Sequence, residues 1–286
     1  MSLRDVLTVL ILTRDEAQNL PPVLESLRPL GARVVVVDSG STDRTCELAR
    51  AAGAEVVVHP FTSQADQVNW ALDALAFSTP WIMRLDADER LTPELAVELP
   101  AALAGAPAEV SGFELKRQVW FWGRWIRHGG YYPTWLFRVW RRGTARSEQR
   151  WMDEHMVSAS GRLARLRHDI IDENLKGLSH FVEKHNGYAD REVNDLLAQE
   201  AAQEAAHAAG GVQGQAGRRR WLKQNVYGRS PLFLRAFAYW FLRYFLRLGV
   251  LDGLPGLVFH FNQGLWYRLL VDAKLHERRR RGRDRA

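Results

Sequence analysis

Two aspartates separated by one residue, Asp86 and Asp88, stand directly after the apolar segment Trp81–Leu85. Carboxylates at this spacing can hold a hard divalent cation. Mg²⁺ or Mn²⁺ takes one or two protein carboxylates and fills its other positions with phosphate oxygens and water. Such a cation would neutralise a diphosphate as it leaves. The same two residues would also suit a solvated turn, so this pair alone leaves both interpretations open.

Two further polar clusters also follow apolar segments. Thr13-Arg14-Asp15-Glu16 follows Leu7–Leu12, and Ser39-Gly40-Ser41-Thr42-Asp43 follows Asp38. The Asp38 carboxylate can accept hydrogen bonds from a ribose or a base edge, and the small residues after it let a ligand approach the backbone. Ser41, Thr42 or Asp43 is expected to cap the next helix. Capping does not explain Asp38.

The elements that must position these clusters alternate between strands and helices. Apolar runs predict strands, and helical spacing predicts helices between them. The strands are Leu7–Leu12, Arg33–Asp38, Glu55–His59 and Trp81–Leu85; the helices are Asn19–Leu27, Asp43–Ala52, Gln64–Ala76 and Thr92–Leu103. This alternation indicates βαβ units and a parallel sheet. Ligands of such sheets bind beyond the carboxyl ends of the strands, where all three clusters lie.

Three segments, LTVLILTRDEAQNL, VVVVDSGSTDRT and WIMRLDADE, resemble the family 2 glycosyltransferases with the GT-A fold. The resemblance implies that Asp86 and Asp88 bind a divalent metal, Mg²⁺ or Mn²⁺, and the donor diphosphate. It also implies a set of residues that bind the nucleotide of a nucleotide-sugar, with UDP as the expected nucleotide. That set is Thr13, Arg14, Glu16, Asp38, Ser39 and Asp86. Gln67 with Asn69 resembles a polar pair facing the donor, although a helix surface would use the same residues.

The middle of the chain extends the resemblance. RHGGYYPTWLFRVWRRG followed by RWMDEHM is similar to the subset that glycosylates lipopolysaccharide core or lipid-linked saccharides. In that subset an acidic residue here is the general base, which implies Glu154 or its neighbour Asp153. The acceptor-binding candidates are Trp125, His128, Tyr131 and Arg138, with packing of an irregular subdomain or a surface charge as the alternatives.

The fold class implied is α/β: a GT-A domain over residues 1–175, with a Rossmann-like, mostly parallel sheet flanked by helices. Residues 176–286 are expected to form a helical, membrane-interface extension. The implied activity is inverting transfer of a sugar in one displacement. The alternatives are a sugar-nucleotide nucleotidyltransferase, which would show a glycine-rich loop after the first strand, and a non-catalytic relative that binds nucleotide-sugars or polyanions.

The C-terminal part is strongly basic. Residues 218–286 carry 16 Lys or Arg and 4 Asp or Glu, so they contribute +12 to a total of +6 and leave −6 for residues 1–217. Leu234–Leu248 combines aromatic residues with arginines in one arc, which is typical of a helix in a membrane interface with arginines reaching headgroups. The Arg278–Arg281 run, with Arg283 and Arg285, suits anionic lipid.

These features predict a cytoplasmic protein, peripheral on the inner face of the plasma membrane. The single cysteine fits a reducing compartment, and we see neither a signal peptide nor an apolar run long enough to span a bilayer. Nucleic acid is not an expected partner, because it would leave the acidic N-terminal part and the Asp-x-Asp pair unexplained.

Overall fold

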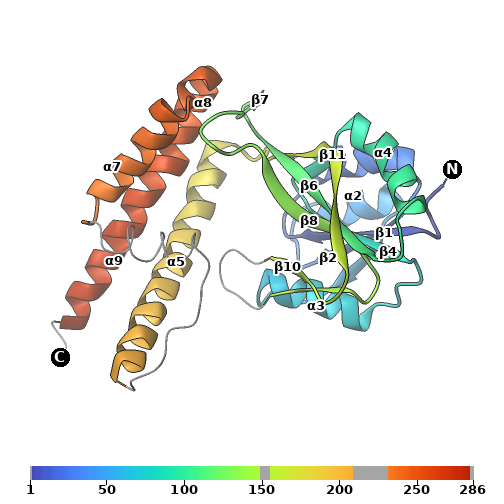
Figure 1. Ribbon diagram of the computed structural model, residues 1–286, viewed down its shortest axis with the longest axis horizontal. Helices are drawn as coiled ribbons and strands as arrows, with labels where there is room; N and C mark the ends of the chain where they lie inside the picture. The colour runs from blue at the N-terminus through green and yellow to red at the C-terminus, as the bar shows by residue number, and fades with distance from the viewer. Residues whose placement is uncertain (1, 149–154, 209–230, 284–286) are drawn as a thin grey trace. The chain divides into compact units, whose positions relative to one another are not determined.

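The computed structural model describes residues 2–148, 155–208 and 231–283. The chain forms two compact units (Figure 1). One comprises Met1–Arg127 and Tyr131–Gly177, and is called here the α/β unit. The other, the helical unit, comprises Leu178–Ala286 together with the short piece His128–Gly130. Each unit is described by itself.

The first half of the α/β sheet is parallel. Its strands are β1 (Leu7–Thr13), β2 (Arg33–Asp38), β3 (Glu55–Val58) and β4 (Trp81–Asp86), in the order β3-β2-β1-β4. All neighbouring pairs in this half are parallel. These are the four predicted strands, with ends that differ by one residue at most. The three polar clusters therefore lie at the carboxyl ends of β1, β2 and β4.

The second half of the sheet is mixed. It continues with β8 (Thr134–Arg141), β6 (Val110–Phe121), β11 (Arg162–Glu173) and β5 (Glu89–Leu91), while β7 (Arg124–Trp125) pairs with β6. β8 is antiparallel to both β4 and β6, β11 is parallel to β6, and β5 is antiparallel to β11. The mostly parallel sheet predicted from the sequence is therefore confirmed in the first half, whereas the second half contains both parallel and antiparallel pairs. β9 (Ala145–Ser147) and β10 (Met156–Ser158) form a separate ribbon.

Helices cover both faces of the parallel half. They are α1 (Leu20–Leu27), a 3-10 turn η1 (Arg28–Leu30), α2 (Thr45–Ala51), α3 (Gln64–Ala74) and α4 (Pro93–Ala104). Val9 and Ile11 of β1 pack with side chains of α1 and α4, whereas Leu10 packs with side chains of α3. Burial of each such side chain contributes roughly 1.5–3 kcal/mol. A strand buried on both faces gives its loop a rigid base.

The helical unit is built around a hairpin. After α5 (Gly177–Ala208) come α7 (Leu234–Phe241), η3 (Leu242–Leu246), η4 (Gly249–Asp252), α8 (Gly253–His260), η5 (Phe261–Trp266) and α9 (Tyr267–Arg283). α7 packs on η5 and η3 packs on α8, so the chain reverses direction at η4. Side chains of α5 and α9 form the core of the unit. Within the described residues, we find no helix with both the length and the apolar character needed to cross a membrane.

The arginines of the hairpin do not face outward as the sequence predicts. Arg235 is 7% exposed, and its Nε donates to Asp272 Oδ1 at 2.8 Å. Arg243 Nε donates to the Gly129 carbonyl at 2.6 Å. Only Arg247 is exposed. The prediction that these arginines reach headgroups is therefore wrong for Arg235 and Arg243, because internal acceptors turn them toward the interior of the unit.

The piece His128–Gly130 is held by this hairpin. Asp252 is 2% exposed, and it accepts hydrogen bonds from the backbone N–H of His128 at 3.0 Å and from the His128 ring at 2.7 Å. The Gly129 N–H donates to the Arg247 carbonyl at 2.8 Å. His260 packs so closely on Gly129, whose φ is +71°, that a Cβ at Gly129 would overlap its ring. Glycine is therefore required there.

Candidate active site

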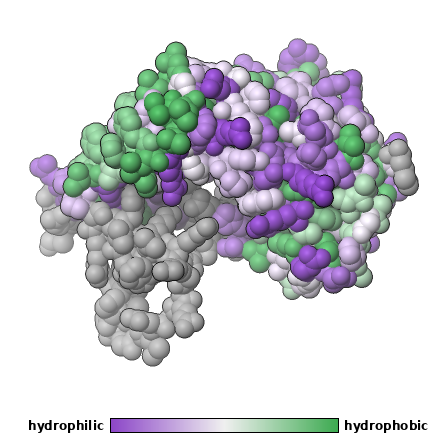
Figure 2. Space-filling view, turned by 45° about the horizontal axis from the view of Figure 1, so that its top comes forward, coloured by the Kyte–Doolittle hydropathy of each residue, from purple (hydrophilic) through white to green (hydrophobic). Residues whose placement is uncertain are grey.

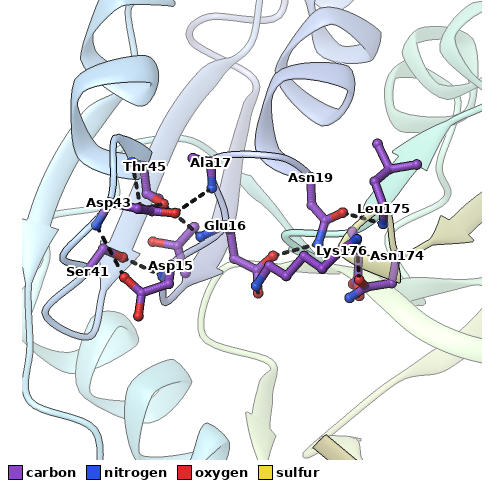
Figure 3. A network of polar contacts seen from close by, with 12 residues as sticks. Asp15, Glu16, Ala17, Asn19, Ser41, Asp43, Thr45, Asn174, Leu175 and Lys176 are labelled. Atoms are coloured by element: carbon purple, nitrogen blue, oxygen red, sulfur yellow. Dashed lines mark hydrogen bonds and ion pairs between the residues drawn. The ribbon is translucent and has the colours of Figure 1, made fainter. Parts of the chain in front are cut away.

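The loops that follow β1 and β2 are laced together by hydrogen bonds (Figure 3). Three successive backbone N–H groups after β1 donate to side-chain oxygens of the loop between β2 and α2 or of the first residue of α2. The pairs are Asp15 to Ser41 at 2.8 Å, Glu16 to Thr45 at 2.7 Å and Ala17 to Asp43 at 3.0 Å. In return, Asp15 Oδ1 accepts the Thr42 N–H at 2.7 Å. Asp43 also accepts the N–H of Thr45, the first residue of α2, at 2.9 Å, although the N-cap position itself is occupied by Arg44, which makes no side-chain cap hydrogen bond.

Asp38 lies at the base of this loop pair and is 1% exposed. It accepts hydrogen bonds from Thr13 Oγ1 at 2.8 Å, Gly40 N–H at 3.0 Å and Ser41 N–H at 2.7 Å. Burial raises the pKa of Asp38, but the hydrogen bonds from Ser41 and Thr13 outweigh it, so the pKa lies below its usual value. Two predicted nucleotide-site residues, Thr13 and Asp38, are thus in direct contact, and Asp38 is an ionised acceptor.

The other predicted nucleotide-site residues differ in setting. Ser39 is half-buried and its N–H donates to the Thr13 carbonyl at 2.9 Å. Arg14 is exposed. The amide of Gln67 is turned toward its own loop, since Nε2 donates to the carbonyls of His59 and Pro60, both at 2.9 Å. Asn69 is bonded to the backbone of Ser147 at 3.0 Å in both directions. The side-chain amides of Gln67 and Asn69 therefore stabilise loops of the protein.

A segment directly after β11, residues 174–176, joins the same site from about 160 positions away in the chain. Lys176 Nζ forms an ion pair with Glu16 Oε1 at 2.7 Å. Asn19 bridges the two segments, because its Nδ2 donates to Glu16 Oε2 and its Oδ1 accepts the Leu175 N–H, both at 2.7 Å. Asn174 Nδ2 donates to Asp88 Oδ2 at 3.2 Å. The segment therefore touches both the Glu16 loop and the Asp-x-Asp turn.

Sequence reasoning did not identify Asn174 or Lys176. Their local sequence, Glu-Asn-Leu-Lys-Gly, carries no motif, and only the pairing of β11 with β6 and β5 brings them to this edge of the sheet.

Asp86 lies between two buried arginines. Arg84 donates to Oδ1 at 3.0 Å, and Arg138 donates to Oδ2 at 3.0 Å. The side chains of Arg84 and Arg138 are 3% and 9% exposed, while that of Asp86 is 30% exposed. Arg84 was missed in the sequence, although a charged residue inside the apolar strand Trp81–Leu85 is a usable signal, because a buried charge needs a partner.

Arg138, one of the predicted acceptor-binding residues, lies at the centre of a buried ion cluster. It donates to Glu89 Oε1 at 2.6 Å as well as to Asp86. Burial lowers the pKa of Arg138, but the charges of Glu89 and Asp86 outweigh this and raise it above its ordinary value. Burial raises the pKa of the Glu89 carboxyl group. The positive charge of Arg138 lowers it, but only in part, so the pKa lies above its usual value. The guanidinium is therefore committed to holding the turn 86–89 to β8.

The donor set suits one divalent cation held by one or two carboxylates. Arg84 and Arg138 balance the charges of Asp86 and Glu89, and Asp88 accepts the hydrogen bond from Asn174. Among the described residues, no three His, Cys, Asp or Glu side chains gather into a cluster. Mg²⁺ and Mn²⁺ need no such cluster, since they use one or two carboxylates together with phosphate oxygens. The residues present fit the predicted metal, with Asp86 and Asp88 as the carboxylates that would hold it.

The predicted acceptor residues divide between the two units. Trp125 lies in β7, half-buried, with its ring edge-on to Tyr132 at 4.9 Å. Tyr131, also half-buried, follows it in the α/β unit, and its carbonyl accepts from Thr134 at 2.6 Å. His128 belongs to the helical unit and is held by Asp252. The predicted general bases, Asp153 and Glu154, lie outside the described residues.

Comparison with known proteins matches residues 8–175 to the family model "Glycosyl transferase family 2". An uncharacterized glycosyltransferase of Rickettsia bellii is 36% identical over 93 residues, which cover 32% of this chain and 31% of that protein. An uncharacterized glycosyltransferase of Mycobacterium bovis is 37% identical over 99 residues, covering 33% and 44%. The chain thus spans between 31% and 44% of the length of these two relatives.

Solved structures give distant matches. Residues 1–349 of TarS from S. aureus align at 15% identity and a TM-score of 0.40, covering 66% of each chain. Glucosyl-3-phosphoglycerate synthase from Mycobacterium tuberculosis, crystallised with Mn²⁺, UDP and glucosyl-3-phosphoglycerate, aligns at 22% identity and a TM-score of 0.33, covering 40% of this chain and 44% of that one.

Proposed function

Because the chain belongs to glycosyl transferase family 2, we propose that it moves a sugar from a nucleotide-sugar, with UDP as the nucleotide, to a lipid-linked or lipopolysaccharide-core saccharide. Its α/β unit has the GT-A-like sheet of that family, flanked by helices. The observation that carries the proposal is the convergence of three strand ends and the 174–176 segment on one edge of the sheet.

In this proposal the donor nucleotide lies against the laced loops after β1 and β2. Thr13 and Asp38 form the floor, and the ionised Asp38 favours a hydrogen-bond donor such as a ribose hydroxyl or a base N–H. A ligand group that donates to Asp38 would share it with Gly40 and Ser41. Ser39 and Arg14 lie beside this floor, and the exposed Arg14 supplies positive charge for a phosphate.

The diphosphate end lies toward the Asp86-Ala87-Asp88 turn. Asp88, with Asp86 beside it, would hold Mg²⁺ or Mn²⁺, which stabilises the charge of the departing diphosphate when bound. Arg84 and Arg138 keep Asp86 fixed and balance its charge. A preorganised turn of this kind stabilises developing charge without reorganisation during the reaction.

The acceptor hydroxyl must lose its proton as it attacks the anomeric carbon. A carboxylate within hydrogen-bond reach of that hydroxyl is the required base. Glu154 is proposed for this role on the sequence pattern, with Asp153 as the alternative. Attack from the face opposite the diphosphate inverts the anomeric configuration in one displacement, and no covalent enzyme intermediate is needed.

A lipid-linked acceptor requires the enzyme to work at a membrane surface. The helical unit supports this, because many of its large hydrophobic side chains are exposed. The proposed place of action is the inner face of the plasma membrane, with the chain bound peripherally.

The proposal is tested by incubating the protein with a panel of labelled UDP-sugars, Mg²⁺ or Mn²⁺, and a lipid extract from bacterial envelopes. The expected result is label that moves from the aqueous to the organic phase with one UDP-sugar, and that requires the metal. The control is Asp88→Ala, which should abolish transfer. Labelled pyrophosphate incorporated into a UDP-sugar would instead support the nucleotidyltransferase alternative.

A further inference from the structure

The hairpin of the helical unit has an unusual surface. Of the twenty exposed large hydrophobic residues in the described part of the chain, thirteen lie between residues 233 and 261. We name this set the apolar hairpin surface: Phe233, Leu234, Phe237, Phe241, Leu242, Phe245, Leu246, Leu248, Val250, Leu251, Leu254, Leu257 and Phe261. Figure 2 shows hydrophobic residues gathered over this part of the molecule. Soluble monomers rarely expose so large a contiguous apolar set without a partner.

Three of the four charged residues of the same stretch are not exposed. Arg235 and Asp252 are buried and Arg243 is half-buried, whereas Arg247 is exposed. Arg235 is paired with Asp272, and Asp252 binds His128. Polar groups that are satisfied inside, beneath an outer face of Phe, Leu and Val, form the pattern expected of a segment whose solvent is hydrocarbon.

A protein partner fits this surface poorly. Protein interfaces carry about one hydrogen bond per 100–200 Å² and a polar rim. The thirteen side chains of the apolar hairpin surface offer no donor or acceptor. The one exposed charge in the stretch, Arg247, is positive, which suits the negative surface of a cytoplasmic leaflet. A lipid bilayer is therefore the occupant that the composition and the charge favour.

The backbone conformation at the turn of the hairpin also supports contact with lipid. Leu248 has φ +60° and ψ +25°, a left-handed conformation that costs a branched residue energy and that glycine adopts freely. Its side chain is nevertheless 51% exposed. A large apolar side chain held outward at a strained position gains nothing in water, but gains hydrophobic burial in lipid.

The geometry limits the depth of insertion. α7 and η3 together have 13 residues, 8 and 5, so this arm is roughly 20 Å long at about 1.5 Å per residue. A hydrocarbon core is about 30 Å thick. The arm can therefore enter one leaflet. The arginine run from Arg278 begins 17 residues beyond Phe261 along a continuous helical stretch, roughly 25 Å away.

We propose that the apolar hairpin surface inserts into one leaflet of a lipid bilayer, and that this insertion, rather than the arginine-rich end of α9, provides most of the affinity for membranes. The inserted unit also holds His128–Gly130, whose chain neighbours Arg127 and Tyr131 belong to the α/β unit. Its use in sugar transfer rests on the proposed function, but binding to vesicles does not depend on catalysis.

The test is flotation of the full-length protein with vesicles of pure phosphatidylcholine, which carry no net charge, at 0.1 M and 0.5 M NaCl. The expected result is binding at both salt concentrations. Phe241→Ser with Leu246→Ser should lose at least 10-fold in partition coefficient. Val58→Ser with Val97→Ser is the matched control, since these residues of the α/β unit are 62% and 79% exposed, and it should bind like wild type.

Charge reversal of the arginine run separates the two modes of binding. Arg279→Glu with Arg280→Glu should leave binding to neutral vesicles unchanged. Binding that needs anionic lipid, disappears at 0.5 M NaCl and is lost in this variant would overturn the proposal. So would sedimentation equilibrium that shows a stable dimer dissociated by Phe241→Ser with Leu246→Ser, together with no flotation of wild type.

A fluorophore reports insertion directly. The chain has one cysteine, Cys46, so Leu246→Cys in a Cys46→Ala background can be labelled at a single site with an environment-sensitive dye. A blue shift on addition of neutral vesicles, with quenching by lipids brominated on their acyl chains, is expected. An unchanged emission maximum would refute insertion even where the protein floats. Transfer activity on an acceptor in detergent tests the proposed function separately.

Discussion

The ion cluster around Arg138 makes a quantitative prediction. Its guanidinium, 9% exposed, lies between Glu89, 1% exposed, and Asp86. Arg138→Met leaves the charge of Glu89 buried without its main partner. Breaking a buried pair in this way typically costs about 3–5 kcal/mol. For a chain of this size that corresponds to a fall in melting temperature of roughly 6–20 °C.

The assay is urea unfolding of the wild type, Arg138→Met, and Arg138→Met combined with Glu89→Gln. The double variant removes both charges, so it should recover much of the lost stability. The matched control is Arg165→Met, because Arg165 pairs with Glu114 at 3.0 Å but is 61% exposed. Exposed pairs contribute about 0–1 kcal/mol, and the control should change little.

The refuting result is specific. If Arg138 served mainly to bind the acceptor, as the sequence pattern suggested, Arg138→Met would raise the KM for the acceptor while stability fell by less than about 1 kcal/mol, within the range of an exposed pair. Destabilisation that the double variant does not relieve would also contradict the ion-cluster account.

Three further predictions follow from the site and the hairpin. Asp88→Asn should weaken Mn²⁺ binding, measured by electron paramagnetic resonance in the presence of UDP, more than Asp86→Asn does; equal losses would place both carboxylates on the metal. Lys176→Met should raise the Kd for UDP by roughly 5- to 30-fold, about 1–2 kcal/mol, because Glu16 loses its cation; an unchanged Kd would mean that the ion pair is dispensable. Burial lowers the pKa of His260, so its contribution to the stability of the helical unit is present above the unfolded value of about 6.5 and is lost as pH falls through the folded one; His260→Gln should remove that dependence between pH 7 and 5, and an unaltered pH profile would exclude this histidine.

Much of the parallel half of the sheet is visible in the sequence, because its strands are apolar along their whole length and end in polar clusters. A strand buried on both faces, such as Leu7–Thr13, appears in the sequence as a continuous run of apolar residues, which is typical of a parallel sheet. Because these strands are parallel, the loops that follow them must lie at the same end of the sheet. The second half is less visible, because β8 and β6 run antiparallel and mix charged with aromatic residues.

The hairpin shows what an amphipathic pattern cannot decide. The arc of Arg235, Arg243 and Arg247 is a real property of the sequence, yet the pattern does not say which face meets the interior. Asp272 lies 37 residues from Arg235, and the Gly129 carbonyl lies 114 residues from Arg243. Only tertiary structure supplies these acceptors, and they turn Arg235 and Arg243 inward.

The role of residues 174–176 in the site could not be predicted from the sequence for a related reason. Lys176 is a lysine after a strand, and its meaning comes from Glu16, which the sheet brings within 2.7 Å. Local propensity carries no information about such a pair. The buried Arg84 is the opposite case, since its position in an apolar strand already requires an acidic partner.

The most direct test of the central claim is calorimetric titration of the protein with UDP, in Mg²⁺, in Mn²⁺ and in excess chelator, with GDP and ADP as competitors of the same charge. The account predicts UDP binding that is preferred over GDP and ADP and that weakens when the metal is removed. Absence of UDP binding under every metal condition would contradict a nucleotide-sugar site at the ends of β1, β2 and β4, and with it the proposed transfer of a sugar.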